Sequence, residues 1–183
     1  MANGILKVSN IQTSSGSGTI TLGQSGETIA LGSGVTSKFN QPAFQAELSA
    51  NQEVTDNTDT KVQFDTEIFD TDNCYDNSTN YRFTPTVAGK YYVYLNLGVN
   101  GKSNSNLNVG YSYIYKNGSR VTLGHGNYNN NPPFMDTLQA FAVIEMNGTT
   151  DYIEAYGKGD VNSGGARFDG DDFSVFGAYR IGA

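Results

Sequence analysis

Few side chains in this chain could carry out covalent chemistry, and they stand far apart in the sequence. There is one histidine, His125, in a Gly-His-Gly segment predicted to be a loop after a strand, and one cysteine, Cys74, in a polar loop. A nucleophile needs a base beside it, and a zinc site needs more nitrogen or sulfur ligands than these two residues supply. We therefore predict that the protein is not an enzyme. His125 is instead predicted to contact a ligand or a neighbouring subunit, or to be an ordinary loop residue.

Two acidic runs offer the clustered oxygen atoms that calcium prefers. The first contains Asp70, Asp72 and Asp76, and the second contains Asp169 and Asp171. Neither run has the spacing or the terminal glutamate of the helix-flanked calcium loop. Two interpretations stay open, a calcium site or solvated turns in which Asp and Asn bond to their own backbone.

Tyrosine and asparagine residues gather in segments that we expect to be exposed, Tyr111–Tyr115, Gly124–Pro133 and Val161–Asp172. These residue types can stack on a sugar and hydrogen-bond to it. The predicted ligand is a glycan, and the candidate contacts are Tyr111, Tyr113, His125, Tyr128, Asn129 and Asn130. The alternative for the long Asn-rich loop is packing against a neighbouring subunit.

Strands must position these residues, because the composition favours β structure. Glycine and the aromatic residues Tyr and Phe are abundant, Trp is absent, and strong helix formers are few. Alternating apolar and polar residues predict about eight strands. They lie near Phe44–Leu48, Val62–Phe69, Tyr91–Leu97, Tyr111–Lys116, Val121, Leu138–Ile144, Tyr152–Tyr156 and Phe173–Ile181. The Asn117-Gly118 pair predicts a tight hairpin turn.

The strand at Tyr91–Leu97 is apolar or aromatic on both faces. Tyr91, Val93 and Leu95 alternate with Tyr92 and Tyr94. A strand buried on one side only would carry polar residues opposite, so Tyr92 and Tyr94 indicate a second buried surface. The alternative is that they are ordinary amphipathic surface tyrosines.

The first 38 residues contain a nine-residue repeat and form a separate segment. Ile11, Ile20 and Ile29 are equally spaced, and Leu22 and Leu31 each follow an isoleucine by two positions. A unit this short buries too little to fold alone, so we predict a stalk in which three chains intertwine. The alternative is a flexible Gly/Ser linker. The predicted domains are therefore residues 1–38 and 42–183.

Charge and hydropathy exclude several classes of partner. The net charge of −7 lacks the basic footprint that nucleic acid requires. No stretch reaches the apolar length of a membrane span, and the first residues show no signal-peptide pattern. We expect synthesis in a reducing cytoplasm, with no nucleic-acid partner and no membrane insertion.

An ordered series of motifs resembles the complement C1q and tumour-necrosis-factor jelly-roll superfamily. The motifs, in order along the chain, are Pro42–Ala46, Val62–Asp65, Phe69–Thr71, Tyr75–Asp76, Phe83–Pro85, Gly89–Tyr94 and Phe173–Gly177. The resemblance covers about Pro42 to Ile181. It implies an all-β antiparallel jelly-roll sandwich of about eight to ten strands, and a homotrimer.

In this family the last strand and the aromatic faces meet around the three-fold axis. The resemblance therefore makes Tyr92, Tyr94 and Tyr179 candidate interface residues of the head. The stalk would add its repeat residues, which are Ile11, Ile20, Leu22, Ile29 and Leu31. Some family heads also hold calcium near the trimer apex.

A jelly-roll head on a slender β stalk is similar to fibre and appendage proteins of bacteriophages, including marine and cyanobacterial phages. This resemblance implies a virion structural protein, made in the host cytoplasm, that contacts other virion proteins through its N-terminal segment. The head would bind a host-surface receptor or glycan. The alternative is a capsid or tail decoration protein with no specific receptor. A glycan-cleaving tailspike is disfavoured, because the head is small and no long β-helix is present.

Overall fold

The computed structural model describes residues 41–102 and 106–182, together with Ile11 and Ser33. The chain divides into two units, Met1–Phe39 and Asn40–Ala183. Ile11 is exposed, whereas the other repeat residues, Ile20, Leu22, Ile29 and Leu31, lie outside the described residues. The stalk at residues 1–38 therefore stays a prediction, and all the strands described belong to the second unit.

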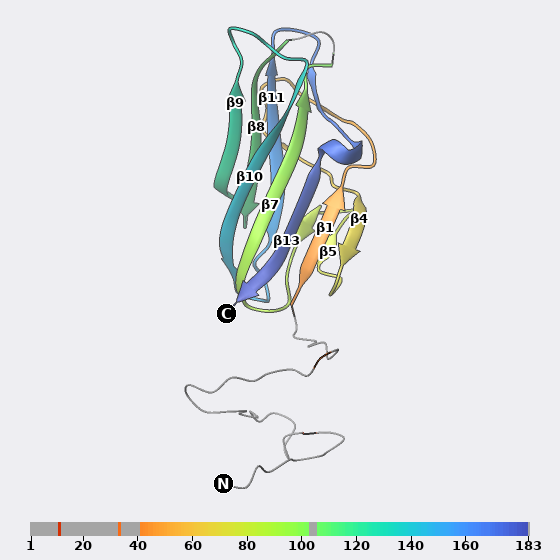
Figure 1. Cartoon of the computed structure of the whole chain (residues 1–183), viewed down its shortest axis with the longest axis vertical. Coiled ribbons are helices and arrows are strands. Elements are labelled where there is room, and N and C mark those ends of the chain that lie inside the picture. Colours follow the sequence, from red (N-terminus) through yellow and green to blue (C-terminus); the bar gives the residue numbers. More distant parts are fainter. Residues whose placement is uncertain (1–10, 12–32, 34–40, 103–105, 183) are drawn as a thin grey trace. The chain divides into compact units, whose positions relative to one another are not determined.

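The described residues of the second unit form two antiparallel sheets (Figure 1). Sheet A contains, in spatial order, β2 (Gln52–Val54), β12 (Ala166–Phe168), β7 (Gly89–Asn100), β13 (Val175–Gly182), β1 (Ala43–Glu47) and β4 (Thr66–Asp70), and β10 (Met135–Met146) also pairs with β7. Sheet B contains β5 (Tyr75–Asp76), β6 (Arg82–Phe83), β11 (Ile153–Val161), β8 (Leu107–Lys116) and β9 (Ser119–Asn127), and β3 (Thr60–Lys61) also pairs with β11. Eight of these described strands have five or more residues, which agrees with the prediction from alternation.

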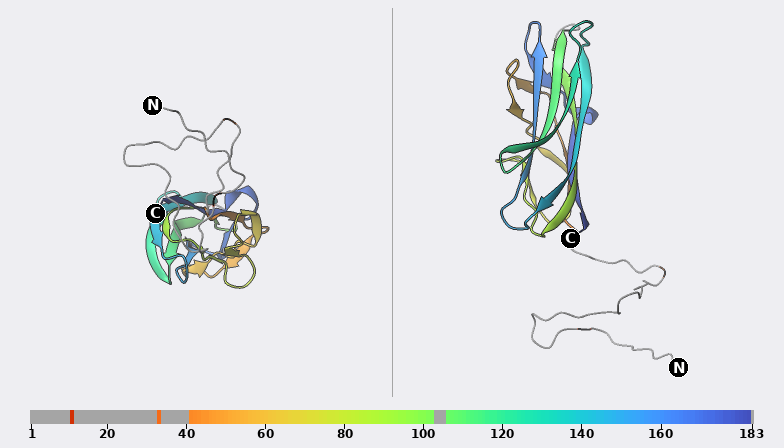
Figure 2. Two further views of the ribbon diagram at one scale, coloured as in Figure 1. Left: turned by 90° about the horizontal axis from the view of Figure 1, so that it is seen from below. Right: turned by 90° about the vertical axis from the view of Figure 1, so that its left-hand side faces the viewer.

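The core lies between the two sheets, which enclose it when the head is seen end-on (Figure 2). Successive side chains of a strand point to opposite faces, so alternate residues of β7, such as Tyr91, Val93 and Leu95, are buried in the core. Each fully buried side chain of this kind stabilises the fold by about 1.5–3 kcal/mol. The rings of Phe44 and Phe83 stack with their centroids 4.6 Å apart, which links β1 of sheet A to β6 of sheet B.

The turn that joins β8 to β9 is formed as predicted. Asn117 and Gly118 have φ angles of 50° and 76°, the left-handed values that a tight hairpin turn requires and that Asn-Gly pairs tolerate. β8 and β9 then pair over nearly their whole length, with Tyr111 opposite His125. His125 therefore lies inside β9, which corrects the prediction that it belongs to a loop.

Two further local predictions were wrong in detail. Val62 and Phe64 are fully buried as expected, but their segment leaves the ladder after β3, and pairing resumes only at β4. Phe173 lies in a short 3-10 helix, η1 (Asp171–Phe173), so the last strand starts two residues later than predicted. No helix among the described residues has the length and hydropathy that a membrane span requires.

Candidate functional site

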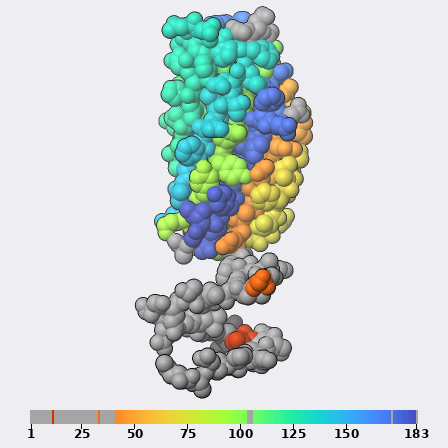
Figure 3. All heavy atoms as spheres, in the orientation of Figure 1, coloured from red at the N-terminus to blue at the C-terminus, as the bar shows by residue number. Residues whose placement is uncertain are grey.

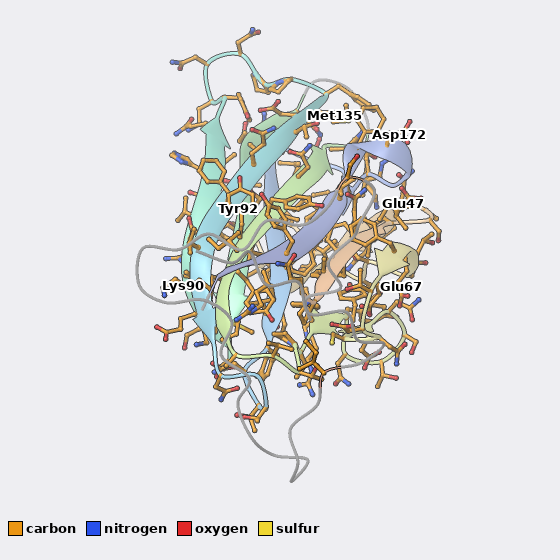
Figure 4. All side chains as sticks on the ribbon, turned by 60° about the horizontal axis from the view of Figure 1, so that its bottom comes forward. Glu47, Glu67, Lys90, Tyr92, Met135 and Asp172 are labelled. Carbon is orange, nitrogen blue, oxygen red and sulfur yellow. The ribbon has the colours of Figure 1, made fainter. Side chains whose placement is uncertain are left out.

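Sheet A has an apolar outer surface, formed by β10, β7 and β13, which we call the apolar face. Because side chains alternate along a strand, the residues between the core positions point outward here. They are Tyr92, Tyr94, Phe141, Val143, Val175 and Tyr179. Phe141 is 62% exposed and Val143 is 57% exposed. This face is turned toward the viewer in Figure 3, and Tyr92 is labelled in Figure 4.

The structure brings together the three tyrosines that were predicted as interface residues of the head. The ring of Tyr92 lies with its centroid 6.3 Å from that of Tyr94 and 5.5 Å from that of Tyr179. The Tyr94 hydroxyl donates a hydrogen bond of 2.9 Å to Oε1 of Gln45. To do so it crosses β13 at Gly177, where a Cβ would overlap the hydroxyl. Burial raises the pKa of Tyr94, so this hydroxyl stays a neutral donor.

A hollow of about 450 Å³ opens on the apolar face. Its lining includes Tyr92, Tyr94, Phe141 and Val175, so its walls are largely aromatic and aliphatic. Exposed apolar side chains that gather around such a hollow are typical of surfaces that pack against another protein.

The outer surface of sheet B is also rich in tyrosine but carries charged side chains beside its rings, and we call it the aromatic–cation face. Strand pairing aligns its residues in rows that run across β9, β8 and β11. One row contains His125, Tyr111 and Lys158, and the next contains Leu123, Tyr113 and Tyr156. Arg120 and Tyr115 are paired in the row after these.

The aromatic rings of this face stack on one another. The ring centroid of Tyr111 lies 5.5 Å from that of Tyr113 and 5.6 Å from that of His125, with nearly parallel planes in both pairs. Three of the predicted ligand contacts are therefore neighbours. Tyr113 is only 2% exposed, however, so its side chain supports Tyr111 and Arg120 from below instead of meeting a ligand directly. Burial, together with the nearby Asp59 carboxylate to which it is hydrogen-bonded, raises the pKa of Tyr113.

Cations lie over three of these rings. The Arg120 guanidinium is 5.3 Å from the Tyr113 centroid, and Nζ of Lys158 is 4.7 Å from that of Tyr111. Nζ of Lys61 lies near the Tyr156 ring and also forms a 2.5 Å ion pair with Glu154, whose side chain is only 6% exposed. Three tyrosine rings of this face thus lie beneath cations, and two of these cations, Lys61 and Lys158, pair with the carboxylates of Glu154 and Asp59.

The other three predicted ligand contacts lie in the loop between β9 and β10. Tyr128 packs against the core, and its hydroxyl donates a hydrogen bond to the Asp136 carboxylate. Burial, followed by this bond, raises the pKa of Tyr128. Tyr128 therefore anchors the loop, whereas Asn129 and Asn130 are exposed and free to meet a ligand.

The carboxylates of the first acidic run bond to their own turns. Asp70, at the end of β4, accepts a 2.7 Å hydrogen bond from the backbone N–H of Tyr75. Asp76 accepts one of 2.9 Å from the backbone N–H of Thr79, which holds the pKa of Asp76 below its ordinary value. Asp72 lies in the exposed turn between β4 and β5. These contacts are those expected of solvated turns.

In the second acidic run, Asp169 is likewise bonded within the fold. Asp169 is 5% exposed and accepts hydrogen bonds of 2.9 Å from Nδ2 of Asn100 and from Nε of Arg167. Asp171 begins η1. No three His, Cys, Asp or Glu side chains in the described residues are grouped so as to hold a metal ion. Calcium binding by these five aspartates stays a prediction.

Cys74 is a buried thiol. It is 7% exposed, and burial raises its pKa above the ordinary value. A cysteine nucleophile needs a lowered pKa and access to solvent, and Cys74 has neither.

Several residues of both faces were not predicted from the sequence. Phe141 and Val143 carried a usable signal, because the alternation that predicts their strand already implies that they point away from the core. Arg120 and Lys158 carried none, since only the register of β8 with its two neighbours brings them to tyrosine rings.

Comparison with known proteins finds the same architecture. A family profile described as the C1q domain matches residues 43–179, while no similarity to a curated protein was found. Murine APRIL at pH 5.0 superposes with a TM-score of 0.58 and 8% identity, covering 77% of this chain and 99% of that chain. The globular domain of zebrafish complement 1qA gives a TM-score of 0.53 and 13% identity, covering 76% and 97%. Eiger TNF from S. frugiperda gives 0.53 and 9%, covering 77% and 91%. At these identities the structural likeness shows a shared jelly-roll fold alone.

Proposed function

Because the chain belongs to the C1q-domain family, we propose that it is a non-enzymatic binding head that works as a homotrimer. The observation that carries this proposal is the apolar face, where Phe141 and Val143 are more than half exposed. Large apolar side chains gathered on one face favour burial against another protein surface. The family resemblance implies that this surface belongs to a second copy of the chain.

Both halves of a head-to-tail contact are present on the apolar face. Val143 projects from β10 beside the hollow, and the hollow itself, lined in part by Tyr94 and Phe141, can receive a side chain. A contact between two different patches closes into a ring when the rotation between subunits allows it. Three copies arranged in this way bury all three apolar faces.

The ligand-binding surface that we propose is the aromatic–cation face of sheet B. It lies on the opposite side of the sandwich, so a trimer built through sheet A leaves it accessible. Tyr111 and His125 supply rings and polar groups, and Asn129 and Asn130 add amide donors and acceptors in the adjoining loop. These groups suit a glycan, which presents both apolar ring faces and hydroxyl groups.

We propose further that the head belongs to a bacteriophage virion, held by residues 1–38 to other virion proteins. The support for this step is the nine-residue repeat of that segment, which requires partner chains to bury its isoleucine and leucine residues. Mass spectrometry of purified virions, with proteins of the host lysate as the control, tests it directly.

The oligomeric state of the full chain tests the assembly. We expect sedimentation equilibrium at micromolar concentration to give three times the chain mass of 19.7 kDa. A monomer at that concentration would contradict the proposal.

Incubation with host-surface glycans tests the binding function. Selective binding without cleavage supports a binding head. Failure to bind any surface extract favours the decoration protein, and release of cleaved product would show that the protein is an enzyme.

A further inference from the structure

We propose that the aromatic–cation face selects an acidic saccharide, whose carboxylate is bound by Arg120 and Lys158. This inference rests on the proposed glycan-binding function and names the chemical class of the ligand.

Four cations lie over tyrosine rings among the described residues of this head. They are Lys61, Arg82, Arg120 and Lys158. Three of the four stand over rings of the aromatic–cation face, so the clustering is a property of this surface.

The four cations differ in how far their charge is already satisfied. Lys61 forms a close ion pair with Glu154 and also donates to the backbone carbonyl of Asn80. Among the described residues, Lys158 pairs with the Asp59 carboxylate alone, at 4.0 Å, and the Asp59 side chain is 43% exposed. The Arg120 side chain is exposed and has neither a hydrogen bond nor an ion pair among the described residues. This surface therefore carries one unpaired cation, Arg120, and one weakly paired cation, Lys158, whose side chain is 21% exposed.

The positions of these two cations are fixed by the rings beneath them. Arg120 lies over Tyr113 and Lys158 lies over Tyr111, and those two rings are stacked 5.5 Å apart. Tyr113 is buried and hydrogen-bonded to Asp59, so this support does not move freely. A guanidinium held in place over an aromatic ring has its donors ready for a carboxylate.

The small number of available cations decides between classes of anion. A nucleic acid or another long polyanion is bound by many phosphate contacts, which the net charge of −7 and one unpaired and one weakly paired cation do not support. A single carboxylate needs only such a pair. His125 and Leu123, next to Tyr111 and Tyr113 in their rows, supply a mixed apolar and polar surface for the body of a sugar.

The test measures binding of paired sugars to the full-length protein by calorimetry. The probes are trigalacturonic acid and its methyl ester, and sialyllactose and lactose, so that each acid has a neutral counterpart of similar shape. We expect at least one acid to bind, and we expect its neutral counterpart to bind at least tenfold more weakly.

Three variants locate the site. Arg120→Gln and Lys158→Gln are each expected to weaken binding of the acid by at least tenfold and to leave binding of the neutral sugar unchanged. Arg82→Gln is the matched control, because Arg82 also lies over a tyrosine, Tyr152, at 4.5 Å but is outside the proposed site. Thermal unfolding and molecular mass, measured for every variant, confirm that each is folded and assembled.

The outcomes separate this inference from the function on which it rests. If neutral sugars bind as tightly as acids, or if Arg82→Gln weakens binding as much as Arg120→Gln, the acidic-sugar inference is wrong while glycan binding stands. If no sugar binds to the assembled protein, both are wrong. A monomeric protein that still binds acids overturns the trimer and leaves this inference intact.

Discussion

The two outer faces of the sandwich begin from the same sequence pattern and acquire opposite properties. Each has a long strand with tyrosines at alternate positions, β7 in sheet A and β8 in sheet B. On the apolar face, β10 places Phe141 and Val143 beside those tyrosines. On the aromatic–cation face, the neighbouring strands place His125, Lys158 and Arg120 there instead.

The difference shows that cross-strand partners determine what an alternating tyrosine does. Beside apolar residues, Tyr92 and Tyr94 extend a surface that favours contact with another protein. Beside cations, the neutral rings of Tyr111 and Tyr113 hold the positive charges of Lys158 and Arg120 in positions where they can attract a polar ligand. A substitution on the apolar face should therefore weaken self-association alone, and a substitution on the aromatic–cation face should weaken ligand binding alone.

The largest expected effect is the loss of assembly when a carboxylate is placed on the apolar face. Phe141→Glu should weaken self-association by roughly 1,000-fold, because burying an unpaired carboxylate costs several kcal/mol. Phe141 is 62% exposed in the single chain, so the fold of the head should be retained. Sedimentation equilibrium measures the change, and circular dichroism confirms the fold.

The matched change on the other face is Tyr111→Ser. It should leave the protein trimeric, as measured by sedimentation equilibrium, while weakening the binding of a monovalent sugar. Loss of the trimer in Tyr111→Ser, or a fully trimeric Phe141→Glu, would mean that the two faces have been assigned to the wrong functions.

The next largest effect is the loss of stability expected when either of two glycines, Gly124 or Gly177, is replaced by alanine. A Cβ at Gly124 in β9 would overlap the backbone carbonyl of Gln139 in β10, at the edge where the two sheets meet. A Cβ at Gly177 would overlap chiefly the end of the Tyr94 side chain, which can turn aside, and would come 2.9 Å from the backbone carbonyl of Phe44, a milder backbone overlap than the 1.9 Å at Gly124. We expect Gly124→Ala to lower the free energy of unfolding by about 3 kcal/mol and Gly177→Ala by about 1 kcal/mol. Urea unfolding of both variants checks the order, and equal losses would contradict it.

Features of this fold that depend on neighbouring residues in the sequence could be predicted, whereas features that depend on contacts between distant segments could not. Alternation along one strand is local, so it correctly placed Tyr91 and Val93 in the core and Tyr92 and Tyr94 outside it. The Asn117-Gly118 turn is equally local. The break in pairing after Lys61 was not predictable, because it depends on how that segment meets β11.

The candidate site was predicted only in part for the same reason. Tyrosines could be named from the sequence, but whether each is buried depends on its neighbours across the sheet. Tyr113 was predicted as a ligand contact and is nearly inaccessible, because Arg120, Asp59 and Tyr111 crowd around it. Arg120 was not named at all, since nothing in its own segment shows that it faces Tyr113.

A smaller effect tests whether the ion pair between Lys61 and Glu154 stabilises the aromatic–cation face. Lys61→Met removes the only ion-pair partner that the nearly buried Glu154 carboxylate has among the described residues. We expect a loss of about 2 kcal/mol in the free energy of unfolding at pH 7. This is less than the 3–5 kcal/mol typical of fully buried pairs, because Lys61 is 29% exposed.

Lys158→Met is the comparison variant for stability. Its nearest carboxylate is 4.0 Å away and well exposed, so its removal should change stability by less than about 0.5 kcal/mol. A loss as large as that of Lys61→Met would show that both lysines support the face equally. The double change Lys61→Met with Glu154→Met should recover part of the loss, since no charge is then left unpaired.

An effect smaller than that of Lys61→Met is expected at Asp76. Its turn positions the carbonyl of Asn80 to accept a hydrogen bond from Lys61, at the margin of the same face. The Asp76 carboxylate accepts hydrogen bonds from the backbone N–H groups of Ser78, Thr79 and Asn80, and the bond from Thr79 contributes most to lowering its pKa. A lowered pKa in the folded state means that the ionised group stabilises the fold above its unfolded pKa of 3.8, and that this stability is lost as pH falls through the folded value. Asp76→Ala should therefore cost about 1 kcal/mol at pH 7, a modest amount because the carboxylate lies in a surface turn, where solvent screens its charge. Asp76→Asn keeps an acceptor without the charge, so its deficit relative to the unaltered protein should shrink steadily as urea unfolding is repeated at pH values below 3.8. A deficit that is constant with pH would assign the stabilisation to the shape of the turn and not to its charge.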